Sequence, residues 1–225
     1  SWSACPLQAL RMADQWAASA QAAHSILRDS ATFQWYVIPL FVMVIYMYSQ
    51  QWYAGRWSII LGGLAFWLMD WFNEIWNGLI FHFSNFAPAW GAPADTAYLL
   101  LIGLNIEISL MFAVLGLAAM LTLPKDPKAR ILGLNNRLVW AAGNSALSVL
   151  TEIWLNHIGA LVWEWRYWSA SFPWLIFLFG YMPFYLVGAW VHDMRSRTHQ
   201  IITVSSLAGV VGSGLLVFGV ILGWL

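Results

Sequence analysis

Three long stretches of this 225-residue chain contain no aspartate, glutamate, lysine or arginine. They cover residues 31–55, 167–192 and 198–225. A helix of roughly 20 apolar residues is long enough to cross a bilayer, and each of the three stretches is longer than that. The sequence therefore predicts an all-α protein, a polytopic bundle of helices that spans a membrane.

The composition agrees with this prediction and excludes several other classes of protein. Hydrophobic residues make up 61% of the chain and charged residues 9%, whereas a soluble domain carries about 25% charged residues. The formal net charge is zero and the chain has no basic block, so we expect no nucleic-acid partner. A single cysteine, Cys5, excludes an internal disulfide and any zinc or iron–sulfur site built on cysteines.

We expect about six transmembrane helices in one integral membrane domain that covers residues 1–225. A segment before the first span, residues 6–30, has apolar residues at three- and four-residue steps. This pattern predicts an amphipathic helix, which either lies in the membrane interface or packs on the loops of the bundle. The predicted spans cover residues 33–53, 57–83, 97–123, 138–162, 172–194 and 200–224.

The distribution of lysine and arginine predicts the orientation of the chain. Basic residues are concentrated in cytoplasmic loops. The connections after the first, third and fifth predicted spans hold Arg56, Lys125, Lys128, Arg130, Arg137, Arg195 and Arg197, and the opposite side holds Arg11, Arg28 and Arg166. We therefore expect both termini on the non-cytoplasmic side.

The second predicted span carries the most unusual polar pattern in the sequence. Asp70, Asn73, Glu74 and Asn77 occupy positions i, i+3, i+4 and i+7, so they share one face of the helix. The rest of this span is aromatic and aliphatic. Polar side chains on one stripe of a lipid-buried helix face the interior of the bundle.

Two other spans place polar residues at a similar depth, between the middle and the outer third of the bilayer. They contribute Asn105, Glu107, Glu152, Asn156 and His157. The fifth span adds two tyrosines one turn apart, Tyr181 and Tyr185. We therefore expect these side chains to converge with Asp70 and Glu74 in one buried site.

Four carboxylates share this predicted layer, and no lysine or arginine lies in the same part of any span. Unpaired charges in a medium of low dielectric constant are very costly. Three arrangements remove that cost: some carboxyl groups are protonated, a metal ion neutralises them, or the site is a water-filled pocket that binds a cation or passes protons. A purely structural hydrogen-bond network between helices is the less favoured interpretation, because ionisable residues inside a membrane are functional by default.

The favoured hypothesis is a cofactor-free membrane enzyme that isomerises, cyclises or hydrates an isoprenoid, terpenoid or sterol-like lipid. A protonated carboxyl group protonates an alkene or epoxide and a carboxylate removes a proton elsewhere, while aromatic faces stabilise a carbocation. The expected acid–base residues are Asp70, Glu74, Glu107, Glu152 and His157. The expected substrate-binding residues are Trp71, Asn73, Trp76, Asn77, Asn105, Trp154, Asn156, Tyr181 and Tyr185.

A compact helical bundle with buried carboxylates is similar in design to two families of membrane enzymes. They are the small cofactor-free intramembrane terpene cyclases and the sterol isomerases of the emopamil-binding type. The similarity is one of design, without a shared sequence motif, and it assigns no role to any residue of this chain.

Two alternative hypotheses follow from the same residues. The first is a metal-dependent oxidase, hydroxylase or desaturase with iron or manganese held by Glu74, Glu107, Glu152 and His157. Against it, the paired Glu-x-x-His spacing of di-iron bundles is missing from the sequence.

The second alternative is a transporter, a proton-coupled carrier or a subunit of a larger membrane complex. Proton relays also use intramembrane Asp, Glu and His. The chain shows no inverted repeat of the kind that many transporters have, which lowers the weight of this hypothesis.

Overall fold

The computed structural model of the protein describes residues 15–225, and this part of the chain is mostly helical. A short helix, α2 (Ala18–Ser25), and a 3-10 turn (Ser30–Thr32) come first. Two π-helical segments, Ile176–Tyr181 and Leu215–Ile221, continue helices α7 and α8 at their N- and C-terminal ends respectively. The long helices are α3 (Val37–Tyr53), α4 (Trp57–Ser84), α5 (Ile106–Thr122), α6 (Asn136–His157), α7 (Met182–His192) and α8 (Arg197–Gly214).

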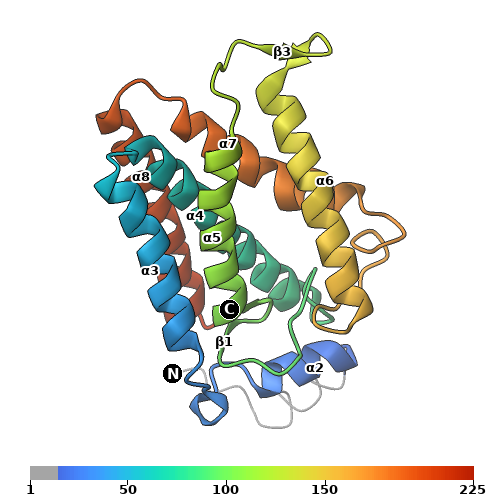
Figure 1. The fold of residues 1–225 in the computed structure, drawn as a ribbon. Helices are drawn as coiled ribbons and strands as arrows, with labels where there is room; N and C mark the ends of the chain where they lie inside the picture. The colour runs from blue at the N-terminus through green and yellow to red at the C-terminus, as the bar shows by residue number, and fades with distance from the viewer. Residues whose placement is uncertain (1–14) are drawn as a thin grey trace.

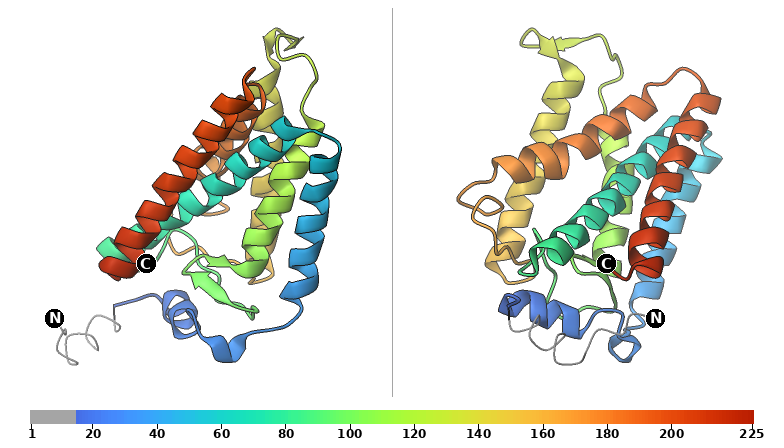
Figure 2. Two further views of the ribbon diagram at one scale, coloured as in Figure 1. Left: turned by 90° about the vertical axis from the view of Figure 1, so that its left-hand side faces the viewer. Right: turned by 180° about the vertical axis from the view of Figure 1, so that it is seen from behind.

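Helix α4 is the centre of the bundle and packs against α5, α7 and α8. Helices α3 and α5 run in one direction and α4, α6 and α8 in the other, while α7 crosses the bundle obliquely (Figure 1). In the two further views, α8 lies along α4 and α3 lies along α5 (Figure 2). Helix α6 packs on the segment formed by the π-helix and α7.

Glycines allow the central helices to approach closely. A Cβ atom added to Gly116 of α5 would lie 2.7 Å from the carbonyl oxygen of Gly63 in α4. One added to Gly62 would lie 2.9 Å from the carbonyl oxygen of Gly188 in α7. Small residues at helix crossings let the two backbones approach closely. These two contacts position α5 and α7 against α4.

Two β-hairpins interrupt the predicted all-α fold. Strands β1 (Leu99–Leu101) and β2 (Leu104–Asn105) pair antiparallel, as do β3 (Arg130–Ile131) and β4 (Leu134–Asn135). Each hairpin leads into a helix. The side chain of Asn105 accepts a hydrogen bond from the backbone N–H of Ile108 at 2.7 Å, and the side chain of Asn135 accepts one from Arg137 at 2.8 Å.

The third and fourth predicted spans therefore need correction at one boundary each. Helix α5 begins at Ile106 rather than at residue 97, because the preceding apolar residues form the first hairpin and Asn105 caps the helix. Helix α6 ends at His157 rather than at residue 162. Its end is set by Gly159, whose φ of +78° is a left-handed conformation that stops a helix.

Helix α2 lies across the end of the bundle that holds the C-terminal residues (Figure 1). The backbone N–H of Ala17 donates to the carbonyl oxygen of Phe86, and that of Arg28 donates to Leu99, each at 2.9 Å. Ala20 and Ala23 are buried. The described part of the predicted amphipathic segment thus packs on the connection between α4 and α5, while residues 6–14 lie outside the described residues.

Two helices in residues 15–225 have the length and the hydropathy that crossing a membrane requires. They are Asn136–His157 and Arg197–Ile221, and the helices Ile106–Thr122 and Ile176–His192 are apolar but shorter. The outward faces of the bundle expose many large apolar side chains, among them Phe41, Ile45 and Leu216. Large exposed apolar surfaces mark contact with a membrane or with another protein.

Candidate functional site

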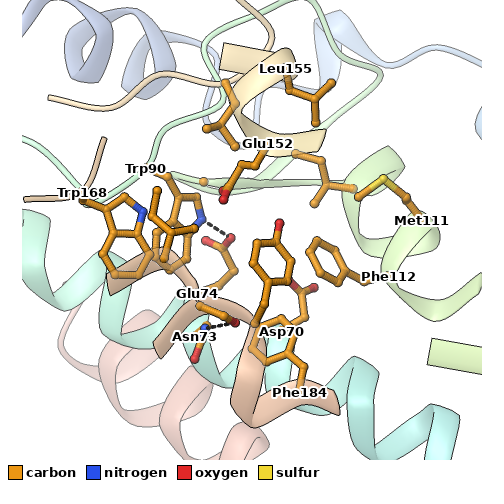
Figure 3. Close-up of a pocket in the computed structure, with 16 residues that line it drawn as sticks. Asp70, Asn73, Glu74, Trp90, Met111, Phe112, Glu152, Leu155, Trp168 and Phe184 are labelled. Carbon is orange, nitrogen blue, oxygen red and sulfur yellow. Dashed lines mark hydrogen bonds between the residues drawn. The ribbon is translucent and has the colours of Figure 1, made fainter. Parts of the chain in front are cut away.

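Three carboxyl groups border one cavity of about 50 Å³ between α4, α5, α6 and the segment formed by the π-helix and α7. Asp70, Glu74 and Glu152 are 3%, 2% and 8% exposed. Figure 3 shows Glu152 of α6 pointing toward the carboxyl group of Glu74 on α4, with Trp90 and Trp168 on one side and Phe112 on the other. The other lining residues are Asn73, Gly103, Ile108, Met111, Leu155, Leu161, Ile176, Gly180, Tyr181 and Phe184.

The periodicity of α4 explains how its polar residues reach the cavity. Asp70, Asn73, Glu74 and Asn77 are all buried, and they form the single polar stripe on the inner face of the helix. Asp70 and Glu74 lie one turn apart, so their carboxyl groups point to the same side. Glu152 meets them from α6, which runs in the same direction as α4 (Figure 1).

Glu74 accepts two hydrogen bonds that hold its carboxyl group in place. The indole N–H of Trp90 donates to Oε1 at 2.6 Å, and the amide Nδ2 of Asn77 lies 3.3 Å from Oε2. Asn77 also fixes Trp90 itself. Its Oδ1 accepts from the backbone N–H groups of Ala89 and Trp90 at 2.8 and 3.2 Å, and its Nδ2 donates to the carbonyl oxygen of Trp90 at 2.8 Å.

Three polar atoms of residues that line the cavity have no hydrogen-bond partner among the described residues. They are Oδ2 of Asp70, Oε2 of Glu152 and Nε1 of Trp168, and all three are buried. Buried polar atoms are almost always paired, because leaving one unpaired costs about 1–3 kcal/mol. Two unpaired carboxyl oxygens and one free N–H donor around a cavity suit a small polar group, such as a water molecule or a substrate hydroxyl.

The cavity combines high carboxyl density with an absence of basic groups. None of the described residues that line it is a lysine, an arginine or a histidine. Three ionised carboxylates in such a place would repel one another and would lack solvation. Protonation of one or more of these carboxyl groups would relieve that repulsion.

An apolar groove of about 680 Å³ adjoins this cavity, and Asn73 and Trp168 line both. Its volume lies in the range of sites that bind small molecules. Exposed side chains such as Phe72 and Phe179 stand at its rim. The remaining lining residues are Met69, Trp76, Ile80, Ala89, Trp165, Tyr167, Leu175 and Pro183.

Asn73 connects the groove to the π-helical segment Ile176–Tyr181. Its Nδ2 lies 3.3 Å from the carbonyl oxygens of Phe179 and Gly180, and its Oδ1 accepts from the indole N–H of Trp76 at 2.9 Å. π-Helical turns are frequent at functional sites. Here the π-helical turn and α4 are held together at the border between the cavity and the groove.

The structure gathers part of the predicted site and leaves the rest elsewhere. Asp70, Asn73, Glu74, Glu152 and Tyr181 line the cavity, Trp76 lines the groove, and Asn77 lies directly behind Glu74.

Glu107 lies outside the cavity, in the first turn of α5. It accepts hydrogen bonds from the hydroxyl of Tyr36, from Thr96 Oγ1 and from the backbone N–H of Ala97. These bonds join α3 to the connection before the first hairpin. His157 is exposed at the last position of α6.

The other predicted binding residues have local roles. Asn105 caps α5, and Asn156 donates to the carbonyl oxygen of Leu161 at 2.9 Å. Tyr185 is buried and its hydroxyl is 2.8 Å from that of Ser148. Trp154 is exposed and Trp71 packs edge-on against Trp67.

Two tryptophans of the cavity were not among the predicted site residues. Trp90 and Trp168 come from connections between helices, and their rings stack with centroids 5.3 Å apart. The chain has 17 tryptophans, and most are expected at membrane interfaces, so the sequence held no signal that singled out these two. Phe112 and Phe184, which also line the cavity, are indistinguishable in sequence from other core aromatics.

The described residues do not bring together the metal ligands of the alternative hypothesis. No group of three or more His, Cys, Asp or Glu side chains in residues 15–225 is arranged to hold a metal ion. Glu107 and His157, two of the four suggested ligands, lie away from Glu74 and Glu152.

Comparison with known proteins relates the chain to a family of membrane proteins. A family model described as "Uncharacterized membrane protein family" matches residues 17–220. A protein of Archaeoglobus fulgidus is 50% identical over 207 residues, which cover 92% of this chain and 98% of the relative. A second, shorter protein of the same organism is 45% identical over 53 residues, 24% of this chain and 95% of the relative.

No solved structure matches the chain. The family model covers most of the sequence, including every residue of the cavity. The chain therefore belongs to this membrane protein family.

Proposed function

We propose that the protein is an integral membrane enzyme that uses Asp70, Glu74 and Glu152 for acid–base chemistry on an apolar lipid of isoprenoid, terpenoid or sterol type. The observation that carries this proposal is the junction of two cavities. A cavity with three carboxyl groups, and with no basic group among the described residues that line it, adjoins an apolar groove at the surface of the bundle.

The hydrogen bonds around the carboxyl groups suggest a division of roles. Two N–H donors contact Glu74 and stabilise a carboxylate, which suits a base. Asp70 and Glu152 each hold a buried oxygen without a partner among the described residues, which suits a protonated acid that donates to the substrate. Tyr181 and the rings of Trp90, Trp168, Phe112 and Phe184 would stabilise positive charge on the substrate through their faces.

The reaction needs no redox partner. Protonation of an alkene carbon by Asp70 or Glu152 consumes the C=C π bond and leaves a carbocation. Loss of a neighbouring C–H proton to Glu74 forms a new double bond and completes an isomerisation or cyclisation. Capture of the cation by water, with loss of one proton from that water to Glu74, completes a hydration.

The same proposal places the bundle in the membrane with six spans, both termini non-cytoplasmic and one domain. The connections α3–α4, α5–α6 and α7–α8 lie at one end of the bundle (Figure 1), and together with the first turns of α6 and α8 they carry seven basic residues, which suits the cytoplasmic face. A groove on the side of the bundle then faces lipid, so that an apolar substrate enters without passing through water.

Substitution of the acid–base residues tests the proposal. Glu74→Gln and Glu152→Gln preserve the shape of the side chain and remove the proton exchange, so each is expected to abolish conversion of isoprenoid alkenes, epoxides or sterols by the purified protein in nanodiscs. Product formation is measured by mass spectrometry.

Glu164→Gln is the matched control, because Glu164 is exposed and lies outside the cavity. It is expected to retain the activity of the parent protein. Full activity of both Glu74→Gln and Glu152→Gln on a substrate that the parent protein converts would refute the assignment.

A further inference from the structure

A second cavity reaches Glu74 from the end of the bundle that carries α2. It has a volume of about 210 Å³, and we call it the vestibule. We infer that the vestibule is a hydrated path that exchanges water and protons between the membrane surface and Glu74. This inference rests on the proposed acid–base role of Glu74 and adds a route for water that is separate from the route for lipid.

The vestibule is built from segments far apart in the sequence. Helix α4 contributes one wall, the segment around α2 a second, the first hairpin a third, and the last residues of the chain a fourth. Its lining residues are Trp16, His24, Leu27, Glu74, Gly78, Phe81, His82, Asn85, Leu101, Ile102, Gly223, Trp224 and Leu225.

Polar groups mark the path from the surface inward. His24 is exposed, His82 is half-buried and Glu74 is buried. His82 stacks on Trp224 with ring centroids 4.6 Å apart, and His24 packs on Trp16 at 4.8 Å. The indole N–H of Trp16 is buried and has no partner among the described residues, so a donor on the vestibule wall is free to bind water.

Three titratable side chains, His24, His82 and Glu74, line the vestibule. The guanidinium of Arg28 lies beside the vestibule and donates to the carbonyl oxygens of Leu100 and Leu225 at 3.1 and 2.9 Å. The lining of the groove differs from that of the vestibule, since it holds no charged residue among those described. Water is therefore favoured in the vestibule and lipid in the groove.

Glu74 is the residue that connects the two routes. It lines both the carboxyl cavity and the vestibule, whereas Asn73 and Trp168 connect the carboxyl cavity to the groove. A proton that Glu74 takes from the substrate can leave through the vestibule while the lipid remains on the other side. Water for a hydration reaction can enter through the vestibule as well.

Cysteine accessibility tests this inference without any substrate. Cys5→Ser provides a cysteine-free background. Single cysteines are then placed at Ile102 in the vestibule, at Phe72 on the groove and at Ala65 in the packed core of α4. Each purified variant in nanodiscs is treated with a small cationic methanethiosulfonate, and the adduct is measured by mass spectrometry.

We expect Ile102→Cys to react about tenfold faster than Phe72→Cys or Ala65→Cys, because only a hydrated thiol ionises to the reactive thiolate. If Ile102→Cys does not fold, His82→Cys takes its place, because His82 also lines the vestibule. Reaction of the vestibule cysteine no faster than that of Ala65→Cys would overturn the inference, whatever the outcome for the catalytic variants.

Discussion

At the scale of single residues, Asn77 organises the site more than any carboxyl group does. Its amide makes hydrogen bonds with the backbone of Ala89 and Trp90 and with the side chain of Glu74. It is fully buried. One side chain on α4 thus fixes the connection that brings the Trp90 indole to Glu74.

Asn77→Ala should therefore destabilise the protein. It leaves two backbone N–H groups and one carbonyl group without their partner, and each unpaired buried group costs about 1–3 kcal/mol. The measurement is thermal unfolding in detergent. Asn144→Ala is the control, because Asn144 donates a single bond to the carbonyl oxygen of Trp140 one turn earlier and its loss should change the midpoint little. Equal midpoints for the two variants would contradict this role of Asn77.

Residue-scale prediction from the sequence succeeded where helical periodicity was the whole argument. The stripe of Asp70, Asn73, Glu74 and Asn77 is buried as a unit. The depth of a residue in the membrane was predicted less well, because it depends on where each helix begins and ends. Glu107 lies in the first turn of α5 and His157 at the end of α6, so both are at the end of the bundle rather than level with Asp70.

At the scale of elements, the sequence located the helices well and their ends less well. Helix α4 occupies Trp57–Ser84 where 57–83 was predicted. The predicted start of α5 is wrong because the residues of β1, Leu99–Leu101, are as apolar as those of a membrane span. The hairpin forms through pairing with β2, a contact between segments that hydropathy along the chain does not report.

The glycine contacts between α4 and α5 give a prediction at this scale. Gly116→Ala places a methyl group 2.7 Å from the carbonyl oxygen of Gly63, and such overpacking costs about 1–3 kcal/mol. Unfolding should therefore occur at a lower temperature than in the parent protein. Gly143→Ala in α6 is the matched control, since no atom lies within 4 Å of its added Cβ, and its midpoint should stay the same or rise. A Gly116→Ala variant as stable as Gly143→Ala would show that the helices are not held at this distance.

At the scale of the whole molecule, three cavities meet around α4. The groove, the carboxyl cavity and the vestibule share Asn73, Trp168 and Glu74 at their borders. No periodicity in the sequence predicted this arrangement, because Trp90 and Trp168 reach it from connections whose path depends on tertiary contacts. Membership in a membrane protein family agrees with a lipid-facing route to the site.

The orientation of the molecule can be tested at the second hairpin. Leu132 at its tip is 98% exposed and lies among basic residues at the end that we assign to the cytoplasm. Leu132→Cys in the Cys5→Ser background should react with an impermeant maleimide in inverted membrane vesicles and remain unlabelled in intact spheroplasts. Labelling in intact spheroplasts but not in inverted vesicles would show that the orientation is the opposite one.

The central claim, that buried carboxyl groups exchange protons with a lipid, is tested most directly by isotope incorporation. The protein in nanodiscs is incubated in D₂O with a panel of isoprenoid alkenes and sterols, and carbon-bound deuterium in the recovered lipids is measured by mass spectrometry. The account predicts stable deuterium at carbon with the parent protein and with Glu164→Gln, and none with Glu74→Gln or Glu152→Gln. Conversion of a lipid without deuterium at carbon, or equal incorporation by the Glu74→Gln and Glu152→Gln variants, would contradict it.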